Sequence, residues 1–238
     1  MGEVIGSKIL IVIPTYNERE NLRLLAEEIL QRVPGVHILV VDDNSPDGTG
    51  EEAETLSKQD SRIHVMHRQG KQGLGTAYIA GFRWALERSY EFVFEMDCDF
   101  SHQPRFLPAF LEAAESADVV LGSRYIRGGG TENWTLLRKF ISYGGNTYAR
   151  TVLGLPFKDV TGGFKCFRRS VLEALPFDEL LSTGYSFQIE LTTRAHRMGF
   201  KIVEVPIVFP DRTRGASKMS GTIFKEAFIN VLKLRSIK

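Results

Sequence analysis

Two aspartates, Asp97 and Asp99, stand two residues apart after an apolar stretch, in the segment EMDCDFSHQP at residues 95–104. Side chains at positions i and i+2 of a strand face the same way, so both carboxylates can address one ion. Two carboxylates, together with the phosphates of a ligand, are a common way to hold Mg²⁺ or Mn²⁺. A helix cap or a salt bridge near Pro104 is the alternative, and so short a pattern leaves both open.

Three other side chains, His102, Cys98 and Glu190, could also take part in chemistry. His102 is a candidate third metal ligand, although a single histidine is more often packed or solvated. Cys98, between the two aspartates, is predicted to point to the opposite face and to pack. Glu190, on one face of a predicted helix, is either a general base or an exposed carboxylate.

Basic residues form two groups further along the chain. The first group flanks a glycine-rich segment at 125–134 and comprises Arg124, Arg127, Arg138 and Lys139. The second comprises Arg212, Arg214 and Lys218. Arginine suits bidentate phosphate recognition, and lysine suits point-charge neutralisation. Solvated surface is the alternative for any one of them, but an acidic pair and two basic loops around one crevice would suit a phosphorylated donor and a phosphorylated acceptor.

The elements that must position these groups alternate regularly in the first half of the chain. Apolar, β-branched runs predict strands at 8–14, 36–43, 62–68, 90–97 and 117–123, with helices at 17–33, 51–59, 73–89 and 104–116 between them. This alternation predicts an α/β fold with a doubly wound, mainly parallel sheet and helices on both faces. Ligands of such sheets bind outside the carboxyl ends of the strands, where Asp43, Asp97 and Arg124 all fall.

The second half is less regular. We expect helices at 138–154, interrupted by Gly144 and Gly145, and at 185–199, then a strand at 201–209. The segment 222–238 predicts an amphipathic helix with a basic side, which either packs on the core or lies on an anionic membrane surface. We therefore expect one catalytic domain at 1–221 followed by this C-terminal helix.

Composition narrows the function classes. The 238 residues are 43% hydrophobic and 25% charged, as in ordinary globular proteins, and a net charge of +1 gives no global field for nucleic acid. Two cysteines suit a reducing compartment, and no apolar run is long enough to predict a membrane span. The first strand-to-helix turn lacks glycine, and Tyr78 stands where GLGTAY would need a third glycine, which argues against a dinucleotide site.

The chain carries, between about residues 8 and 221, the segments IPTYNERENL, VVDDNSPDGTG, GLGTAYIAGF, EMDCDFSHQP, GSRYIRGGGTENWTLLRKFIS, DVTGGFKCFRRSVLEAL, GYSFQIELTTRAHRMGF and EVPIVFPDRTRGASKMSG. Together they resemble the polyprenol (dolichol) monophosphate mannose synthases, inverting glycosyltransferases of the GT-A (Rossmann-like) type. The PTYNE and D-x-D patterns alone are shared by many GT-A enzymes, whereas the combination is specific. The sequence around HVMHR and GGNTYAR is most similar to that of bacterial members of the family.

The resemblance implies a role for each matching position. The guanosine site would be lined by Pro14, Tyr16, Glu18, Val41 and Asp43. The donor diphosphate and its metal would meet Asp97, Cys98 and Asp99, with Ser101 near the metal. The lipid phosphate would be held by Arg124, Arg138 and Ser142, and the donor phosphates would be closed over by Arg212 and Lys218. Many relatives have alanine at the position of Cys98, so that contact is expected to come mainly from the backbone.

The reaction implied by the resemblance is transfer of mannose from GDP-mannose to polyprenyl (dolichyl) phosphate with inversion, using Mg²⁺ or Mn²⁺. The acceptor phosphate is already anionic, so no strong general base is needed. The alternatives are a sister transferase that uses another nucleotide sugar, such as UDP-glucose, and a subunit that binds nucleotide sugar without catalysis. Some relatives add C-terminal transmembrane helices; here we expect a cytoplasmic protein, peripheral on the cytoplasmic face of a membrane, attached by its last helix or by a membrane-anchoring partner.

Overall fold

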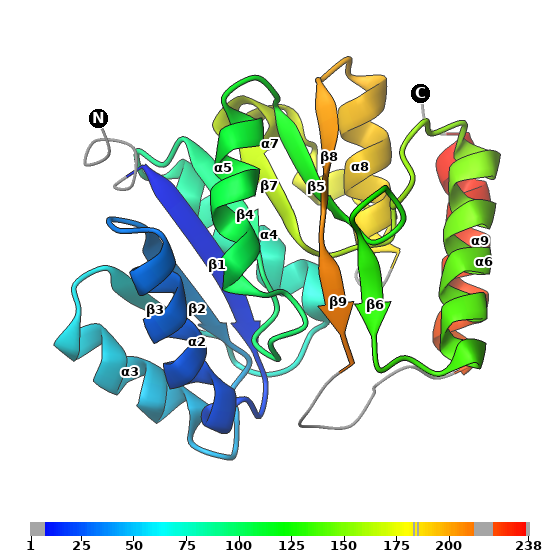
Figure 1. Ribbon diagram of the computed structural model, residues 1–238. Coiled ribbons are helices and arrows are strands. Elements are labelled where there is room, and N and C mark those ends of the chain that lie inside the picture. The colour runs from blue at the N-terminus through cyan, green and yellow to red at the C-terminus, as the bar shows by residue number, and fades with distance from the viewer. Residues whose placement is uncertain (1–7, 183, 185, 212–220, 237–238) are drawn as a thin grey trace.

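A seven-stranded sheet forms the centre of the protein in the computed structural model (Figure 1). The structure describes residues 8–182, 184, 186–211 and 221–236; in the last of these ranges, side chains are described from residue 228 onward. The strand order is β3-β2-β1-β4-β7-β5-β8. These strands are β3 (Ile63–His67), β2 (His37–Asp42), β1 (Ile9–Thr15), β4 (Phe92–Glu95), β7 (Lys165–Arg168), β5 (Val119–Ser123) and β8 (Ile202–Pro206). A separate two-stranded sheet pairs β6 (Gly130–Glu132) with β9 (Val208–Pro210).

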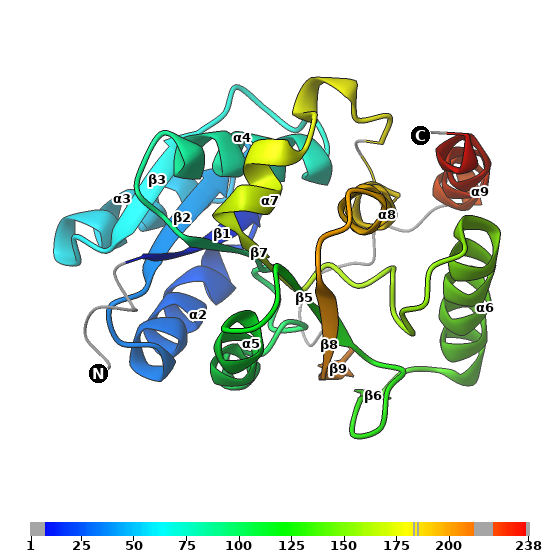
Figure 2. The ribbon, with the colours of Figure 1, turned by 90° about the horizontal axis from the view of Figure 1, so that it is seen from above.

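Helices cover both faces of the large sheet, as predicted (Figure 2). One face packs against α2 (Arg19–Arg32), α3 (Thr49–Gln59) and α5 (Leu107–Ala114). The other packs against α4 (Leu74–Leu86), α7 (Arg169–Ala174) and α8 (Phe187–Arg197). Two 3₁₀ turns, Pro104–Phe106 and Phe177–Glu179, precede α5 and α8. Strand β1 lies between the two layers, and its apolar side chains are therefore buried on both faces.

Close packing of α4 on the sheet depends on one glycine. A Cβ atom at Gly81 would overlap the side chain of Val12 on β1. The absence of a side chain at this position lets the backbone of α4 approach β1. The approach matters for the site described below, because Tyr78, one turn earlier on α4, reaches the end of β4.

The prediction of a mainly parallel sheet is confirmed, and β7 is the exception. It runs antiparallel to both of its neighbours, β4 and β5, while every other pairing in the large sheet is parallel. The sequence did not predict β7, because four residues with charges at both ends are too short a run to be told from a loop.

Two expectations for the second half were wrong in detail. Helix α6 (Leu136–Leu153) continues through Gly144 and Gly145, since a glycine weakens a helix by about 1 kcal/mol without ending it. The expected strand at 201–209 is divided at Ile207: β8 joins the large sheet beside β5, and β9 joins β6.

Helix α9 (Gly221–Arg235) stands beside α6, away from the large sheet (Figures 1 and 2). Its Val231 and Leu234 are buried in a small apolar cluster with α6 and α8, and the rings of Tyr148 and Phe228 stack with centroids 4.5 Å apart. The C-terminal helix thus packs on the protein along one side. In the part of the chain that the structure describes, no helix is long and apolar enough to cross a membrane.

Candidate active site

The loops after β1 and β2 are tied together at the carboxyl edge of the sheet. Asn17 N–H donates to Ser45 Oγ at 3.1 Å, and Glu18 N–H donates to Thr49 Oγ1 at 3.0 Å. Within the strands, Pro14 of β1 lies opposite Val41 of β2. Three of the positions expected to line the nucleoside site, Pro14, Glu18 and Val41, therefore lie on adjoining parts of one edge.

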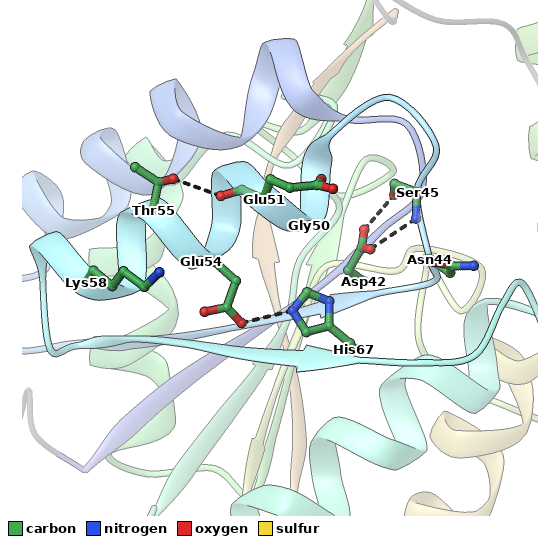
Figure 3. Close-up of a pocket in the computed structure, with 9 residues that line it drawn as sticks. All are labelled: Asp42, Asn44, Ser45, Gly50, Glu51, Glu54, Thr55, Lys58 and His67. Carbon is green, nitrogen blue, oxygen red and sulfur yellow. Dashed lines mark hydrogen bonds and ion pairs between the residues drawn. The ribbon is translucent and has the colours of Figure 1, made fainter.

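An open pocket of about 430 Å³ lies beside α3 at the same edge (Figure 3). Asp42 borders it and accepts hydrogen bonds from Thr15 Oγ1 at 2.9 Å and from the backbone N–H of Ser45 at 3.0 Å. His67 and Glu54 are joined across it at 2.9 Å. Asp42, His67 and Glu54 thus already have hydrogen-bond partners within the protein. We therefore interpret the pocket as part of the structure that holds the loops in place.

Asp43, a predicted nucleoside contact, forms an ion pair with Arg68 that the sequence did not predict. Arg68 Nη1 lies 3.0 Å from Asp43 Oδ1, and Arg68 Nη2 donates to Thr76 Oγ1 at 2.7 Å. Burial raises the pKa of the Asp43 carboxyl above its ordinary value, and the charge of Arg68 offsets this only in part. Nearby, the ammonium of Lys71 lies 4.9 Å from the centre of the Tyr16 ring, so a cation and an aromatic face border the same site.

Asp97, just beyond the end of β4, is held by Tyr78 and His102. Tyr78 Oη donates to Asp97 Oδ1 at 3.0 Å, and the backbone N–H of Asp97 donates to His102 Nδ1 at 2.9 Å. Since Nδ1 accepts, the proton of a neutral His102 ring lies on Nε2, which is 3.9 Å from Asp97 Oδ2. His102 is buried and stacks on Phe164. Its ring is therefore fixed, and its hydrogen bond orients Asp97.

Asp99 is oriented by the turn that follows it. Its Oδ1 accepts from the backbone N–H of Ser101 at 3.0 Å and from Ser101 Oγ at 2.5 Å. Phe100, between them, has a φ of 60°, a conformation uncommon outside glycine that brings Ser101 back toward the carboxylate. The Cys98 side chain packs among apolar residues, as predicted, and burial raises the pKa of its thiol.

The residues at this edge fit a divalent cation. Asp97 and Asp99 supply hard oxygen ligands, which Mg²⁺ and Mn²⁺ prefer. Among the described residues, no group of three or more histidine, cysteine, aspartate or glutamate side chains is gathered to hold a metal. A cation at Asp97 and Asp99 would therefore complete its coordination with ligand phosphates and water, as Mg²⁺ usually does.

A glutamate and a lysine are buried on adjoining strands close to Asp97. Glu95 of β4 is opposite Lys165 of β7, and neither is exposed by more than 1%. Lys165 Nζ donates to the Gln188 carbonyl and, at 2.9 Å, to Thr192 Oγ1. Burial raises the pKa of Glu95 to about 8 and lowers that of Lys165 to about 8. The pair was not predicted from the sequence, although Glu95 at the end of an apolar run was a signal.

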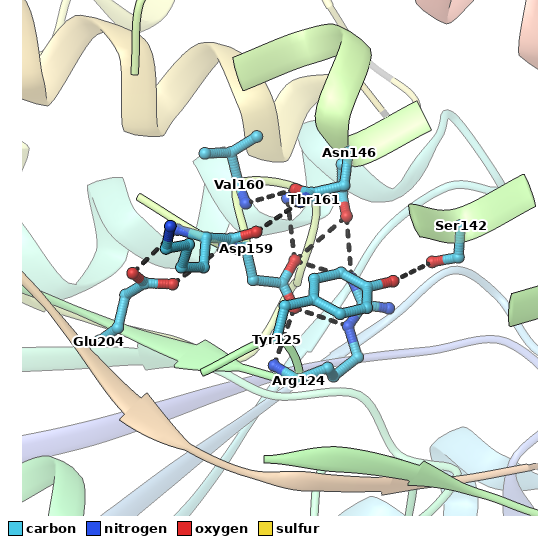
Figure 4. Close-up of polar contacts among 9 residues, drawn as sticks. Arg124, Tyr125, Ser142, Asn146, Asp159, Val160, Thr161 and Glu204 are labelled. Atoms are coloured by element: carbon cyan, nitrogen blue, oxygen red, sulfur yellow. Dashed lines mark hydrogen bonds and ion pairs between the residues drawn. The ribbon is translucent and has the colours of Figure 1, made fainter. Parts of the chain in front are cut away.

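Arg124, at the end of β5, is bound on two sides to Asp159 (Figure 4). Its backbone N–H and Nε donate to Asp159 Oδ2 at 3.0 and 2.7 Å, and its Nη2 donates to Asp159 Oδ1 and to Thr161 Oγ1, both at 2.8 Å. Burial alone would raise the pKa of the Asp159 carboxyl, but the charge and hydrogen bonds of Arg124 outweigh it and hold that pKa below its ordinary value.

The other expected phosphate ligands lie along the start of α6. Ser142 Oγ and Tyr125 Oη are 2.8 Å apart, and Arg138 is paired with Asp211. Trp134, which the sequence analysis did not single out, links the two arginines: its ring centre is 4.0 Å from the Arg138 guanidinium and 5.7 Å from that of Arg124. Arg124, Arg138 and Ser142 are thus brought to one region, where binding of the acceptor phosphate stays a prediction. Arg212 and Lys218 lie outside the described residues.

Glu190 is neither exposed nor available as a base in this arrangement. It is fully buried, and its carboxylate accepts from the backbone N–H groups of Leu181 and Ser182 and from Arg194 Nε at 2.9 Å. The contacts attach the segment before α8 to that helix. The interpretation of Glu190 as an exposed carboxylate is therefore wrong. Its position on one face of a helix did not indicate from the sequence that the side chain is buried.

Comparison with known proteins adds independent findings. The sequence model of glycosyl transferase family 2 matches residues 10–175. An undecaprenyl-phosphate mannosyltransferase of Micrococcus luteus is 50% identical over 226 residues, which cover 95% of this chain and 93% of the relative. A polyprenol monophosphomannose synthase of Mycolicibacterium smegmatis is also 50% identical over 226 residues, covering 94% and 85%.

The solved structures extend the comparison to the fold. Glucosyl-3-phosphoglycerate synthase from Mycobacterium tuberculosis, in complex with Mn²⁺, uridine diphosphate and glucosyl-3-phosphoglycerate, superposes with a TM-score of 0.70 at 21% identity, covering 97% of this chain and 80% of that one. A complex of the same synthase with Mg²⁺ and uridine diphosphate gives the same TM-score and identity. At this identity the likeness concerns the fold alone.

Proposed function

The chain belongs to glycosyl transferase family 2, and within that family we propose that it transfers mannose from GDP-mannose to polyprenyl phosphate with inversion, giving a β-mannosyl phosphoryl polyprenol and GDP. One observation carries the proposal. Two relatives named for mannosyl transfer to polyprenyl phosphates are half identical to this chain over nearly its whole length.

The donor would lie along the carboxyl ends of β1, β2 and β4. Pro14, Tyr16, Glu18 and Val41 adjoin one another there and would line the guanosine, with Asp43 beside them. A carboxylate such as that of Asp43 accepts hydrogen bonds from the N–H groups of a guanine edge. The basic Arg212 and Lys218 would close over the donor phosphates.

The aspartates would hold the diphosphate end of the donor. Mg²⁺ or Mn²⁺ bound by Asp97 and Asp99, with Ser101 near it, would offset the charge that gathers on the departing GDP. Tyr78 and His102 keep Asp97 in one orientation, and the turn at Phe100 does the same for Asp99. Cys98 would contribute through its backbone, because its side chain is buried among apolar residues.

The acceptor phosphate would lie near Arg124, Arg138 and Ser142. Two guanidinium groups and a hydroxyl can donate hydrogen bonds that orient a phosphate whose oxygen attacks the sugar carbon opposite the GDP. Each guanidinium is also paired with an aspartate, Asp159 or Asp211. That oxygen is already anionic near neutral pH, so the attack needs no side chain to remove a proton. The proposed site accordingly has no histidine or glutamate assigned as a base.

Exposed apolar side chains next to this region support contact with a membrane, and we propose that the face contacted is the cytoplasmic one. On α6 they are Leu136, Leu137, Phe140, Ile141 and Tyr143, and on α9 they are Phe228, Ile229 and Leu232. Leu136 and Phe140 are 84% and 78% exposed, which is unusual for large apolar residues. A polyprenyl acceptor lies in the bilayer, so a protein surface of this kind beside the phosphate ligands would bring enzyme and lipid together.

Turnover assays separate the proposal from its alternatives. Purified protein is incubated with undecaprenyl phosphate in detergent and with labelled GDP-mannose or UDP-glucose, in Mg²⁺, Mn²⁺ or EDTA. We expect a mannosyl lipid with GDP-mannose, loss of product in EDTA and loss in Asp99→Asn. No product from GDP-mannose, or equal transfer from UDP-glucose, would contradict the proposal, and full activity of Asp99→Asn would remove the metal assignment.

Flotation with anionic liposomes tests the membrane surface. Phe140→Asp should weaken the binding of the protein to liposomes, whereas Leu24→Asp, an exposed leucine on α2, is the matched control. If wild type does not bind protein-free liposomes although it uses the lipid in detergent, a membrane-anchoring protein would have to supply the attachment.

A further inference from the structure

We infer that Asn146 and Glu204 are positioning residues for the transfer: by fixing the backbone of residues 158–160 they set the place of Asp159, and thereby that of the Arg124 guanidinium. The inference rests on the proposed function, because it concerns the group expected to hold the acceptor phosphate. Neither residue was a candidate in the sequence analysis. Both are drawn in Figure 4 around the segment they hold.

Asn146 holds the segment from α6. It is 1% exposed, and its Nδ2 donates to the carbonyl of Lys158 while its Oδ1 accepts from the backbone N–H of Val160 at 2.9 Å. One amide thus satisfies a donor and an acceptor of the same short segment. An asparagine provides both functions at once, whereas an aspartate lacks the N–H and a leucine lacks both.

Glu204 holds the same segment from β8. Its Oε2 accepts from the backbone N–H of Lys158 and its Oε1 from that of Asp159, both at 2.9 Å. Three successive backbone N–H groups, those of residues 158, 159 and 160, are therefore bonded to side chains from two different elements. An irregular segment has no hydrogen-bond ladder of its own, so these side chains determine where its backbone lies.

Asp159 carries this placement to Arg124. Its amide is fixed by Glu204, and its carboxylate contacts both the backbone N–H and the guanidinium of Arg124. Because the ion pair is bidentate and almost fully buried, a displacement of Asp159 moves the guanidinium with it. A misplacement of about 1 Å in a positioning group can reduce a rate about 100-fold.

The kinetic test measures turnover of undecaprenyl phosphate and binding of GDP with Mn²⁺ in parallel. Asn146→Leu and Glu204→Gln should each lower kcat/KM for the lipid about 10-fold or more, while the Kd for GDP with Mn²⁺ stays within about twofold. The reason is that, among the described residues, Asn146 and Glu204 bond to residues 158–160 and not to the donor site. Asn230→Leu is the matched control: Asn230 is also buried and donates to Ser186 Oγ at 3.0 Å, but it lies on α9 outside this network.

A double-mutant cycle tests whether the effect passes through the guanidinium. In an Arg124→Lys background, Asn146→Leu should cost much less than in wild type, since the bidentate pair with Asp159 is already lost. Fold-losses that simply multiply, or a GDP affinity that falls as much as lipid turnover, would overturn the inference.

A spectroscopic measurement keeps this result separate from the proposed function. The Nε–H resonance of Arg124, identified by its absence in Arg124→Lys, should shift in Asn146→Leu and Glu204→Gln and stay in place in Asn230→Leu. An unchanged resonance in both network variants refutes the positioning role. A wild-type protein that transfers no mannose would refute the proposed function alone, because the resonance still reports whether Asn146 and Glu204 set the guanidinium.

Discussion

Replacing Asp159 by asparagine should destabilise the protein strongly. The two side chains of the Arg124–Asp159 pair are 4% and 0% exposed, and the carboxylate receives three hydrogen bonds from Arg124 and two from Thr161. Removing one member of a buried ion pair leaves an uncompensated charge and typically costs about 3–5 kcal/mol. Asparagine keeps one acceptor oxygen, so we expect a loss near the lower limit, about 3 kcal/mol.

Urea denaturation at pH 7 measures this loss as a lower midpoint at an unchanged slope. For a chain of this size, about 3 kcal/mol corresponds to a fall in Tm of roughly 6–12 °C. Asp178→Asn is the control, because Asp178 and its partner Arg83 are 90% and 51% exposed and such pairs contribute about 0–1 kcal/mol. A loss below about 1 kcal/mol in Asp159→Asn, or one equal to the control, would refute the reasoning.

The pH dependence gives a second test of the same pair. The folded protein holds the pKa of Asp159 below its ordinary value, so this carboxylate contributes stability above the unfolded pKa of about 3.9 and loses it as pH falls toward the lowered folded pKa. The difference in unfolding free energy between wild type and Asp159→Asn should therefore be full at neutral pH and shrink in acid. A constant difference down to pH 3 would contradict the assignment.

Burial raises the pKa of Glu95 from 4.5 to about 8. Because the folded protein keeps this proton and the unfolded chain loses it, the free energy of unfolding should fall as pH rises between those values. Glu95→Gln should therefore flatten the decline in unfolding free energy measured between pH 5.5 and 8. Gly81→Ala should destabilise by about 1–3 kcal/mol in urea because its Cβ meets Val12, whereas Gly145→Ala, with open space, should stabilise by up to about 1 kcal/mol; equal effects would refute the packing argument. Cys98→Ala should keep its specific activity within about twofold, and an inactive but folded variant would give the thiol a role.

The sequence predicted those parts of the fold that rest on local pattern. The five strands of the first half were placed because each is an apolar run between turn residues, and the alternation with helices predicted the common edge at which Asp43, Asp97 and Arg124 end their strands. Asp97 and Asp99 were selected as metal-binding candidates from their spacing and their position after an apolar run, and that role stays a prediction. The roles given to Arg138 and Ser142 came from the family resemblance, because single polar residues on a helix carry no such signal.

Contacts between residues far apart in the sequence could not be predicted from local sequence patterns. Asp159 lies 35 residues from Arg124 in the sequence, and no periodic pattern identifies the partner of a buried arginine. The same holds for Arg68 beside Asp43 and for Lys165 opposite Glu95, each brought together by the strand order of the sheet. Helix propensity alone gave the wrong prediction for α6. Gly144 and Gly145 are weak helix formers, but α6 also packs against α9, and the helix continues through both glycines.

The position of β7 has a consequence for how the chain assembles during synthesis. In the finished sheet β4 lies between β1 and β7, and β5 lies between β7 and β8. A nascent chain that ends before residue 165 therefore presents β4 as an open edge and leaves β5 with no strand beside it. Open edges recruit strands from other molecules, so fragments of this length should aggregate. All seven strands are present only once the chain has been made as far as Pro206, so the sheet is completed well after its first four strands.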